Sequence, residues 1–123
     1  MSTERLSRAF VAGRPAFVGY LMAGYPTREG CLEALEALTE VGVDLIELGV
    51  PYADPLADGP TIREAAEVAR AAHEGGFGLA ETIELAAEFI GAGYHQLRSG
   101  RRRWSAQVSH KIANCPVCLV SDS

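Results

Sequence analysis

The chain has 123 residues, 48% of them hydrophobic, and its 16 acidic residues outnumber its 11 basic ones to give a net charge of −5. This length suits one domain with its own core, and the acidic balance gives no general attraction to nucleic acid or anionic membranes. No run approaches a membrane span or a secretory signal, and three cysteines are too few for a disulfide scaffold, so we expect a reducing, cytoplasmic setting.

Strands and helices are expected to alternate from the start of the chain. A short helix over 3–10 precedes a nearly continuous apolar run at 16–23, which is typical of a strand covered on both faces. An amphipathic helix follows at 29–41, where Leu and Val recur on one side and Glu on the other. Thr27 is placed to cap its start and Gly42 to end it.

A second strand and two more helices follow. The sequence VDLIELG at 43–49 predicts the strand. Thr61 and Glu64 have the T-x-x-E spacing of a capping box, which predicts a helix from there to residue 73, and a third amphipathic helix is expected at 79–90. A strand, a helix and a strand of these lengths indicate parallel strands in an α/β fold.

The character of the sequence changes near Gly93. Residues 1–93 contain six Arg, no Lys and 15 acids, whereas residues 94–123 contain four Arg and one Lys against Asp122 alone. The later segment shows no sustained helical or strand period. We therefore expect an α/β domain over 1–93 and a divergent basic tail over 94–123 that is disordered or out of frame.

Three acids lie where the second strand leads into its loop. Glu47 is in the strand, and Asp54 and Asp58 are in the loop. Parallel α/β folds bind ligands at the carboxyl ends of strands, so these carboxylates could share a site in which a buried acid exchanges protons and a solvated one stays ionised. The residues alone leave two alternatives open: Glu47 could face solvent at a sheet edge, and the two Asp residues could be turn formers.

The tail offers two weaker motifs. Cys115 and Cys118 form a C-x-x-C pair, and His95 and His110 could add zinc ligands, but the spacing fits no usual zinc pattern. The basic, aromatic run at 101–104 is too short to predict nucleic-acid binding. We expect neither a metal nor a nucleic-acid partner.

The string LIELGVPYADPLADGPTI at 45–62 resembles the signature of tryptophan synthase alpha chains, and the similarity extends upstream to Phe17 without an apparent gap. The resemblance implies an α/β fold, the N-terminal portion of a (β/α)8 TIM barrel with about two of its parallel strands. It implies a lyase that cleaves indole-3-glycerol phosphate to indole and glyceraldehyde 3-phosphate in tryptophan biosynthesis. Because the family's chain is about twice this length, we expect an incomplete barrel that is marginally stable and poorly active alone.

The resemblance also implies roles for five residues. Glu47 falls on the family's proton-transferring Glu, and Asp58 falls on the Asp that holds the indole N–H. Tyr20 falls on an aromatic position that packs on the substrate, where Phe is the familiar choice. Pro51 and Asp54 fall on loop positions that face the partner beta chain. Proton transfer by a movable Glu and charge stabilisation by an Asp are the tasks that this cleavage requires.

The family's partner and cofactor lead to further expectations. An alpha2-beta2 tetramer with the tryptophan synthase beta chain is expected, and no cofactor is expected in this chain because pyridoxal phosphate belongs to the beta chain. Ala53 stands where the family usually has Ser or Thr, so the loop loses a hydroxyl. No residue here falls on the substrate-phosphate site, which such barrels build after later strands. The alternative is a non-catalytic fragment that only docks the beta chain.

Overall fold

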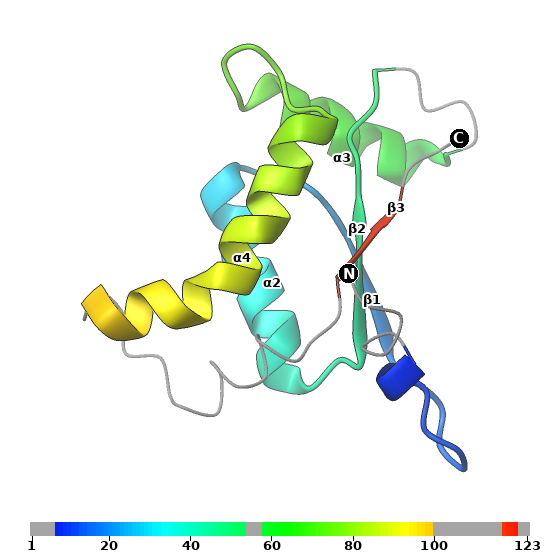
Figure 1. The fold of residues 1–123 in the computed structure, drawn as a ribbon. Helices are drawn as coiled ribbons and strands as arrows, with labels where there is room; N and C mark the ends of the chain where they lie inside the picture. Colours follow the sequence, from blue (N-terminus) through cyan, green and yellow to red (C-terminus); the bar gives the residue numbers. More distant parts are fainter. Residues whose placement is uncertain (1–6, 54–57, 100–116, 121–123) are drawn as a thin grey trace.

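The computed structural model describes residues 7–53, 58–99 and 117–120. The elements in chain order are β1 (Val18–Met22), α2 (Arg28–Val41), β2 (Leu45–Gly49), α3 (Pro60–Ala71), α4 (Leu79–Ser99) and β3 (Val117–Val120). The three strands form one parallel sheet in the order β1-β2-β3 (Figure 1). The parallel α/β architecture predicted from the sequence is therefore confirmed for the described part of the chain.

The ends of the elements test the capping predictions. The Thr27 side chain accepts a hydrogen bond from a first-turn backbone N–H of α2 at 3.0 Å, and Gly42 ends that helix with a left-handed φ of 88°. The predicted capping box at Thr61 is wrong. The helix begins at Pro60, and its N-cap Gly59 makes no side-chain cap bond. Proline suits this first position because its missing N–H would have no partner there.

The described sheet has one strand more than the sequence predicts. Instead of ending near residue 90, α4 continues past Gly93 to Ser99, and Val117–Val120 pairs in parallel with β2. A four-residue apolar run is too short for periodicity to identify as a strand. Residues 100–116 and 121–123 lie outside the described part, so the boundary near Gly93 stays a prediction.

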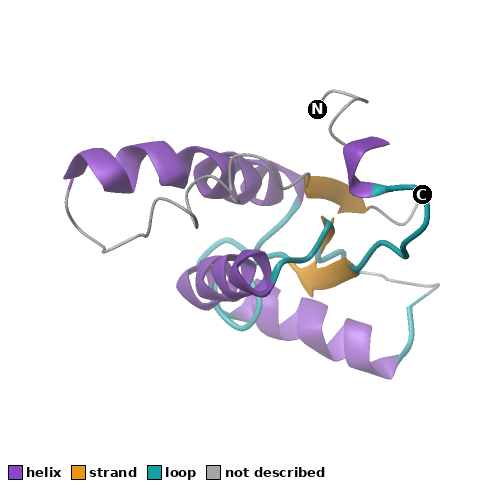
Figure 2. Ribbon diagram, turned by 90° about the horizontal axis from the view of Figure 1, so that it is seen from below, coloured by secondary structure: helices purple, strands orange, loops and turns teal. Residues whose placement is uncertain are grey.

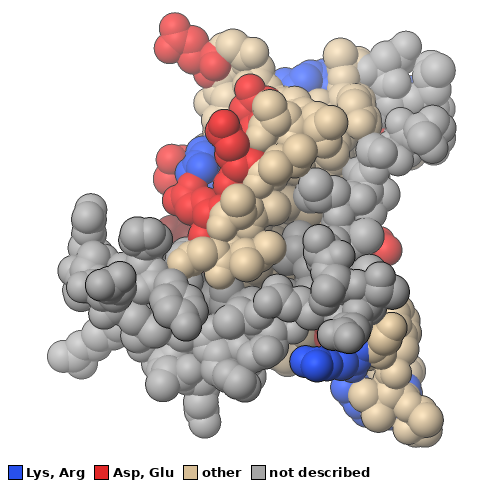
Figure 3. Space-filling view, in the orientation of Figure 1, with Lys and Arg blue, Asp and Glu red and all other residues tan. Residues whose placement is uncertain are grey.

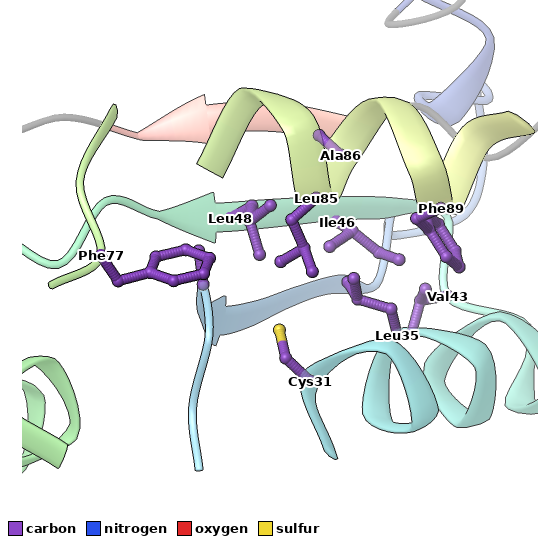
Figure 4. Close-up of a cluster of buried hydrophobic side chains, with 10 residues drawn as sticks. Cys31, Leu35, Val43, Ile46, Leu48, Phe77, Leu85, Ala86 and Phe89 are labelled. Atoms are coloured by element: carbon purple, nitrogen blue, oxygen red, sulfur yellow. The ribbon is translucent and has the colours of Figure 1, made fainter. Parts of the chain in front are cut away.

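The main core lies between one face of the sheet and the helices α2 and α4. Ile46 and Leu48 project from β2 towards Leu35 of α2 and towards Leu85 and Phe89 of α4 (Figure 4). All five side chains are at most 2% exposed. Burying such side chains is the main favourable term in folding, worth about 1.5–3 kcal/mol each. Ile46 and Leu48, which alternate along β2, therefore both pack in this core.

Helix α3 packs on the opposite face of the sheet, at the carboxyl end of β1. Met22 is buried against Ala66 and Ala69 of α3, whereas its neighbour Leu21 packs against the main core. Because successive side chains of a strand point to opposite faces, α3 and the α2–α4 pair must cover different faces. Figure 2 shows the strands with helices on both sides.

An ion pair ties the segment before β1 to the start of β2. The Arg14 guanidinium donates to both carboxylate oxygens of Asp44, at 2.7 and 3.1 Å, and the Phe17 N–H donates to the same carboxylate at 2.8 Å. The Arg14 hydrogen bond, followed by that from Phe17, lowers the pKa of Asp44 from 3.8 to about 2. These bonds hold the two strands together at their amino ends.

The outer side of α4 is acidic. Glu81, Glu84 and Glu88 are exposed along it, and Figure 3 shows carboxylates gathered there around one basic group. Arg28 of α2 donates to Glu88, and this hydrogen bond raises the pKa of the Arg28 guanidinium. The Arg28–Glu88 ion pair thus links α2 to α4 at the edge of the core.

We predict that Asp44→Asn lowers the thermal midpoint of unfolding at neutral pH, because Arg14 loses its charged partner. Folding depresses the pKa of Asp44, so its contribution to stability is present above pH about 4 and is lost as the pH falls through about 2. Thermal melts between pH 7 and pH 2 should show the difference between the two proteins shrinking towards low pH.

The matched control is Glu33→Gln, which removes an exposed carboxylate from α2. It should leave the midpoint close to that of the wild type across the same pH range. A deficit of Asp44→Asn that stays constant down to pH 2 would show that the ion pair is not its source.

Candidate active site

Tyr20 and Glu47 lie side by side across the first two strands. They are partners in the parallel register of β1 and β2. Since Ile46 and Leu48 point into the main core, Glu47 between them points to the other face, and Tyr20 shares that face. Tyr20 is 39% exposed and Glu47 is half-buried. The acid in the strand is therefore on the face that α2 and α4 leave uncovered.

The phenol of Tyr20 reaches across to the end of β2. A Cβ atom at Gly49 would lie 2.0 Å from the Tyr20 hydroxyl oxygen and 2.7 Å from its Cζ, closer than real Cβ contacts allow. Gly49 is two residues beyond Glu47 and shares its face. Glycine is required here for a close approach of a side chain to the backbone. Tyr20 thus covers the carboxyl end of β2 next to the acid.

The chain leaves β2 through a fixed turn. Pro51 is less than 2% exposed. The Tyr52 N–H donates to the Val50 carbonyl at 3.0 Å, and the Tyr52 carbonyl accepts from the guanidinium of Arg70 on α3. Asp54, the predicted partner-facing residue, lies outside the described residues. The interface roles of Pro51 and Asp54 stay predictions.

Asp58 lies at the other end of this loop. It is half-buried and directly precedes Gly59, the N-cap of α3. Because α3 packs against Met22, it covers the same face of the sheet that carries Tyr20 and Glu47. The structure brings Tyr20 and Glu47 together and places Asp58 at the start of the helix on their side. The pairing of Asp58 with Glu47 around one substrate stays a prediction.

The sequence alone does not point to two residues near this site. Cys118, half of the C-x-x-C pair, is the backbone partner of Glu47 on β3. The short apolar run that contains it is the only sequence signal for its place. Arg70 is 18 positions from the Tyr52 carbonyl that it contacts, and no local pattern indicates such a contact.

The described residues include no group of three or more His, Cys, Asp or Glu side chains that could hold a metal ion. Within the same ranges, no helix is both long and apolar enough to span a membrane. The Cys31 thiol is fully buried, and burial raises its pKa, so it serves as a packing group of α2. The side chains of Cys115 and His110 lie outside the described part of the chain.

A parallel sheet covered by helices, with an acid near a strand's carboxyl end, defines the α/β class of proteins, in which ligands bind at that end of the strands. The family model described as "Tryptophan synthase alpha chain" matches residues 6–95. The chain therefore belongs to the tryptophan synthase alpha chain family.

Relatives of known name match the same part. The tryptophan synthase alpha chain of Nitratidesulfovibrio vulgaris (strain Hildenborough) is 49% identical over 71 residues, which are 54% of this chain and 28% of that one. That of Roseiflexus castenholzii is 52% identical over 68 residues, 55% of this chain and 26% of that one. The matched part of this chain therefore spans about a quarter of the length of these curated relatives.

A solved structure agrees with the fold. A chain of the tryptophan synthase a2b2 complex from Pyrococcus furiosus superposes with a TM-score of 0.58 at 32% identity, over 86% of this chain and 35% of that chain. The prediction of an incomplete N-terminal barrel portion is confirmed, with three described strands in place of about two.

We predict that Gly49→Ala lowers the free energy of unfolding by about 1–3 kcal/mol, the usual cost of overpacking. The new methyl group would overlap the Tyr20 phenol. In a Tyr20→Ala background the same change should cost much less, because the overlapping atoms are gone. Denaturant unfolding of the four proteins of this cycle measures the coupling.

Gly91→Ala is the matched control, since a Cβ there meets nothing within 4 Å and the residue is helical. It should be neutral or stabilising by up to about 1 kcal/mol. An equal cost of Gly49→Ala with and without Tyr20 would contradict the close approach.

Proposed function

We propose that this chain carries the acid–base residues of a tryptophan synthase alpha site, which cleaves indole-3-glycerol phosphate to indole and glyceraldehyde 3-phosphate. The supporting observation is the position of Glu47 in the middle of a parallel sheet, on the face away from the main core and beside Tyr20. Placing a carboxylate in such a strand costs free energy unless the group is paired or hydrogen-bonded. An acid kept at this position therefore suggests a functional role. The names of the curated relatives support the reaction class.

Each proposed role follows from the chemistry of a retro-aldol cleavage. Glu47 moves protons: the indole ring carbon that carries the side chain gains a proton, and the adjacent side-chain hydroxyl loses one. The carbon–carbon bond then breaks, its electrons return to the ring, and the hydroxyl carbon becomes the aldehyde. Asp58 accepts a hydrogen bond from the indole N–H and stabilises the positive charge that develops on the ring. Tyr20 packs on the ring.

The proposed partner is a tryptophan synthase beta chain, met through the loop that contains Pro51 and Asp54. The Pyrococcus furiosus structure is that of an a2b2 complex, which supports this partnership. Pyridoxal phosphate would belong to the beta chain, and this chain would need no cofactor of its own. The cytoplasm is the proposed location.

A second candidate function is docking of the beta chain without catalysis. The described residues supply three strands, whereas eight close such a barrel and the substrate phosphate binds after its seventh and eighth strands. In this second function the chain would bind the beta chain through the loop that contains Pro51 and Asp54, and would not catalyse the cleavage.

We predict that the chain, mixed with a purified beta chain, releases indole from indole-3-glycerol phosphate. Glu47→Gln should lower the rate at least about a hundredfold, because general acid–base catalysis contributes 10²–10⁴. Asp58→Asn should lower it by a similar factor through loss of the ionic acceptor. Indole is measured by its absorbance after extraction.

Glu33→Gln is the control for loss of a carboxylate outside the site and should keep the wild-type rate. If the chain comigrates with the beta chain in gel filtration but releases no indole, the result would favour docking without catalysis over the proposed activity. Indole release that Glu47→Gln leaves unchanged would refute the role of Glu47.

A further inference from the structure

The contact between Arg70 and Tyr52 joins the beginning of the β2–α3 loop to the last turn of the helix that follows the loop. Tyr52 lies three residues beyond the end of β2, and Arg70 lies in the last turn of α3. The guanidinium donates to the Tyr52 carbonyl, and Arg70 is partly buried as it does so. Helix α3 thus holds the backbone at Tyr52, shortly after β2 ends.

Both backbone polar groups of Tyr52 are satisfied. Its N–H donates to the Val50 carbonyl at 3.0 Å, which makes a tight turn directly after the strand. Its carbonyl accepts from Arg70. A hydrogen bond from a charged donor is about twice as strong as a neutral one. The direction in which the chain leaves β2 is therefore set from two sides.

The guanidinium is itself held by a packed helix. Its neighbour Ala69 is buried, and with Ala66 it contacts Met22 of β1. Asp58 stands two residues before Pro60, the first residue of the same helix. Any shift of α3 relative to Tyr52 would move Asp58 relative to the strand that carries Glu47.

We propose that Arg70 is a positioning residue for Asp58. By holding the Tyr52 carbonyl against the last turn of α3, it fixes this helix relative to the carboxyl end of β2, and Asp58 moves with the first turn of the same helix. The consequence for catalysis rests on the proposed function, but the positioning itself does not.

The test compares Arg70→Met, which keeps the aliphatic stem but removes the donors, with Arg70→Lys, which keeps a charged donor. Per-residue amide hydrogen exchange is followed by NMR. We expect Arg70→Met to speed exchange of the Tyr52 amide about tenfold or more, from the loss of one charged hydrogen bond. The amide resonance of Asp58 should shift as α3 moves, whereas exchange of the Leu48 amide in β2 should be unchanged.

A spectroscopic signature separates positioning from general stability. The ¹³C resonance of the Tyr52 carbonyl should move upfield in Arg70→Met, because this carbonyl loses a donor, and should return towards the wild-type value in Arg70→Lys. Arg8→Met is the control, since Arg8 is exposed near the N-terminus and its loss should change neither signal.

Two results would overturn the proposal. One is an unchanged signal from Tyr52 or from the Asp58 amide in Arg70→Met, and the other is faster exchange throughout the sheet, which would make Arg70 a general stabiliser. Indole release by the same variants is measured in parallel. Its absence in the wild type would overturn the proposed function alone, because the Tyr52 signals do not depend on it.

Discussion

The parallel register of β1 and β2 is the constraint on which the described structure depends. It pairs Tyr20 with Glu47. A slip of one residue would turn every side chain of the strand to the other face, which would bury the acid and expose Ile46 and Leu48. The core on one face and the Arg14–Asp44 ion pair at the strands' amino ends both oppose that slip.

The same register places the apolar core and the candidate site residues on opposite faces of the sheet. One face of the sheet supplies the apolar contacts with α2 and α4, and the other carries the acid, the phenol and the contact with α3. Arg70 holds the Tyr52 carbonyl shortly after β2 ends, and α3 packs against Met22 of β1. A site at the carboxyl end of a strand can therefore keep its geometry while the stabilising contacts lie elsewhere.

The sequence predicts those parts of the fold that have a long apolar run, a helical period over several turns or a clear capping residue. Apolar runs and helical periodicity identify β1, β2 and three helices, and an acid inside an apolar strand marks Glu47 as a candidate. The strand β3 is missed because four apolar residues carry no period. The Thr61 cap is wrong because Pro60 is the better helix start, and the contact of Arg70 depends on tertiary packing that no local pattern encodes.

The most direct test of the central claim is thiol labelling of single cysteines placed at successive positions of the paired strands. The native cysteines would first be replaced by alanine. We expect cysteines at positions 20 and 47 to react readily with a water-soluble thiol reagent in the folded protein, and cysteines at 46 and 48 to stay protected, because Ile46 and Leu48 are fully buried. Fast labelling at 46 and 48 with protection at 20 and 47 would contradict the register and the site built on it.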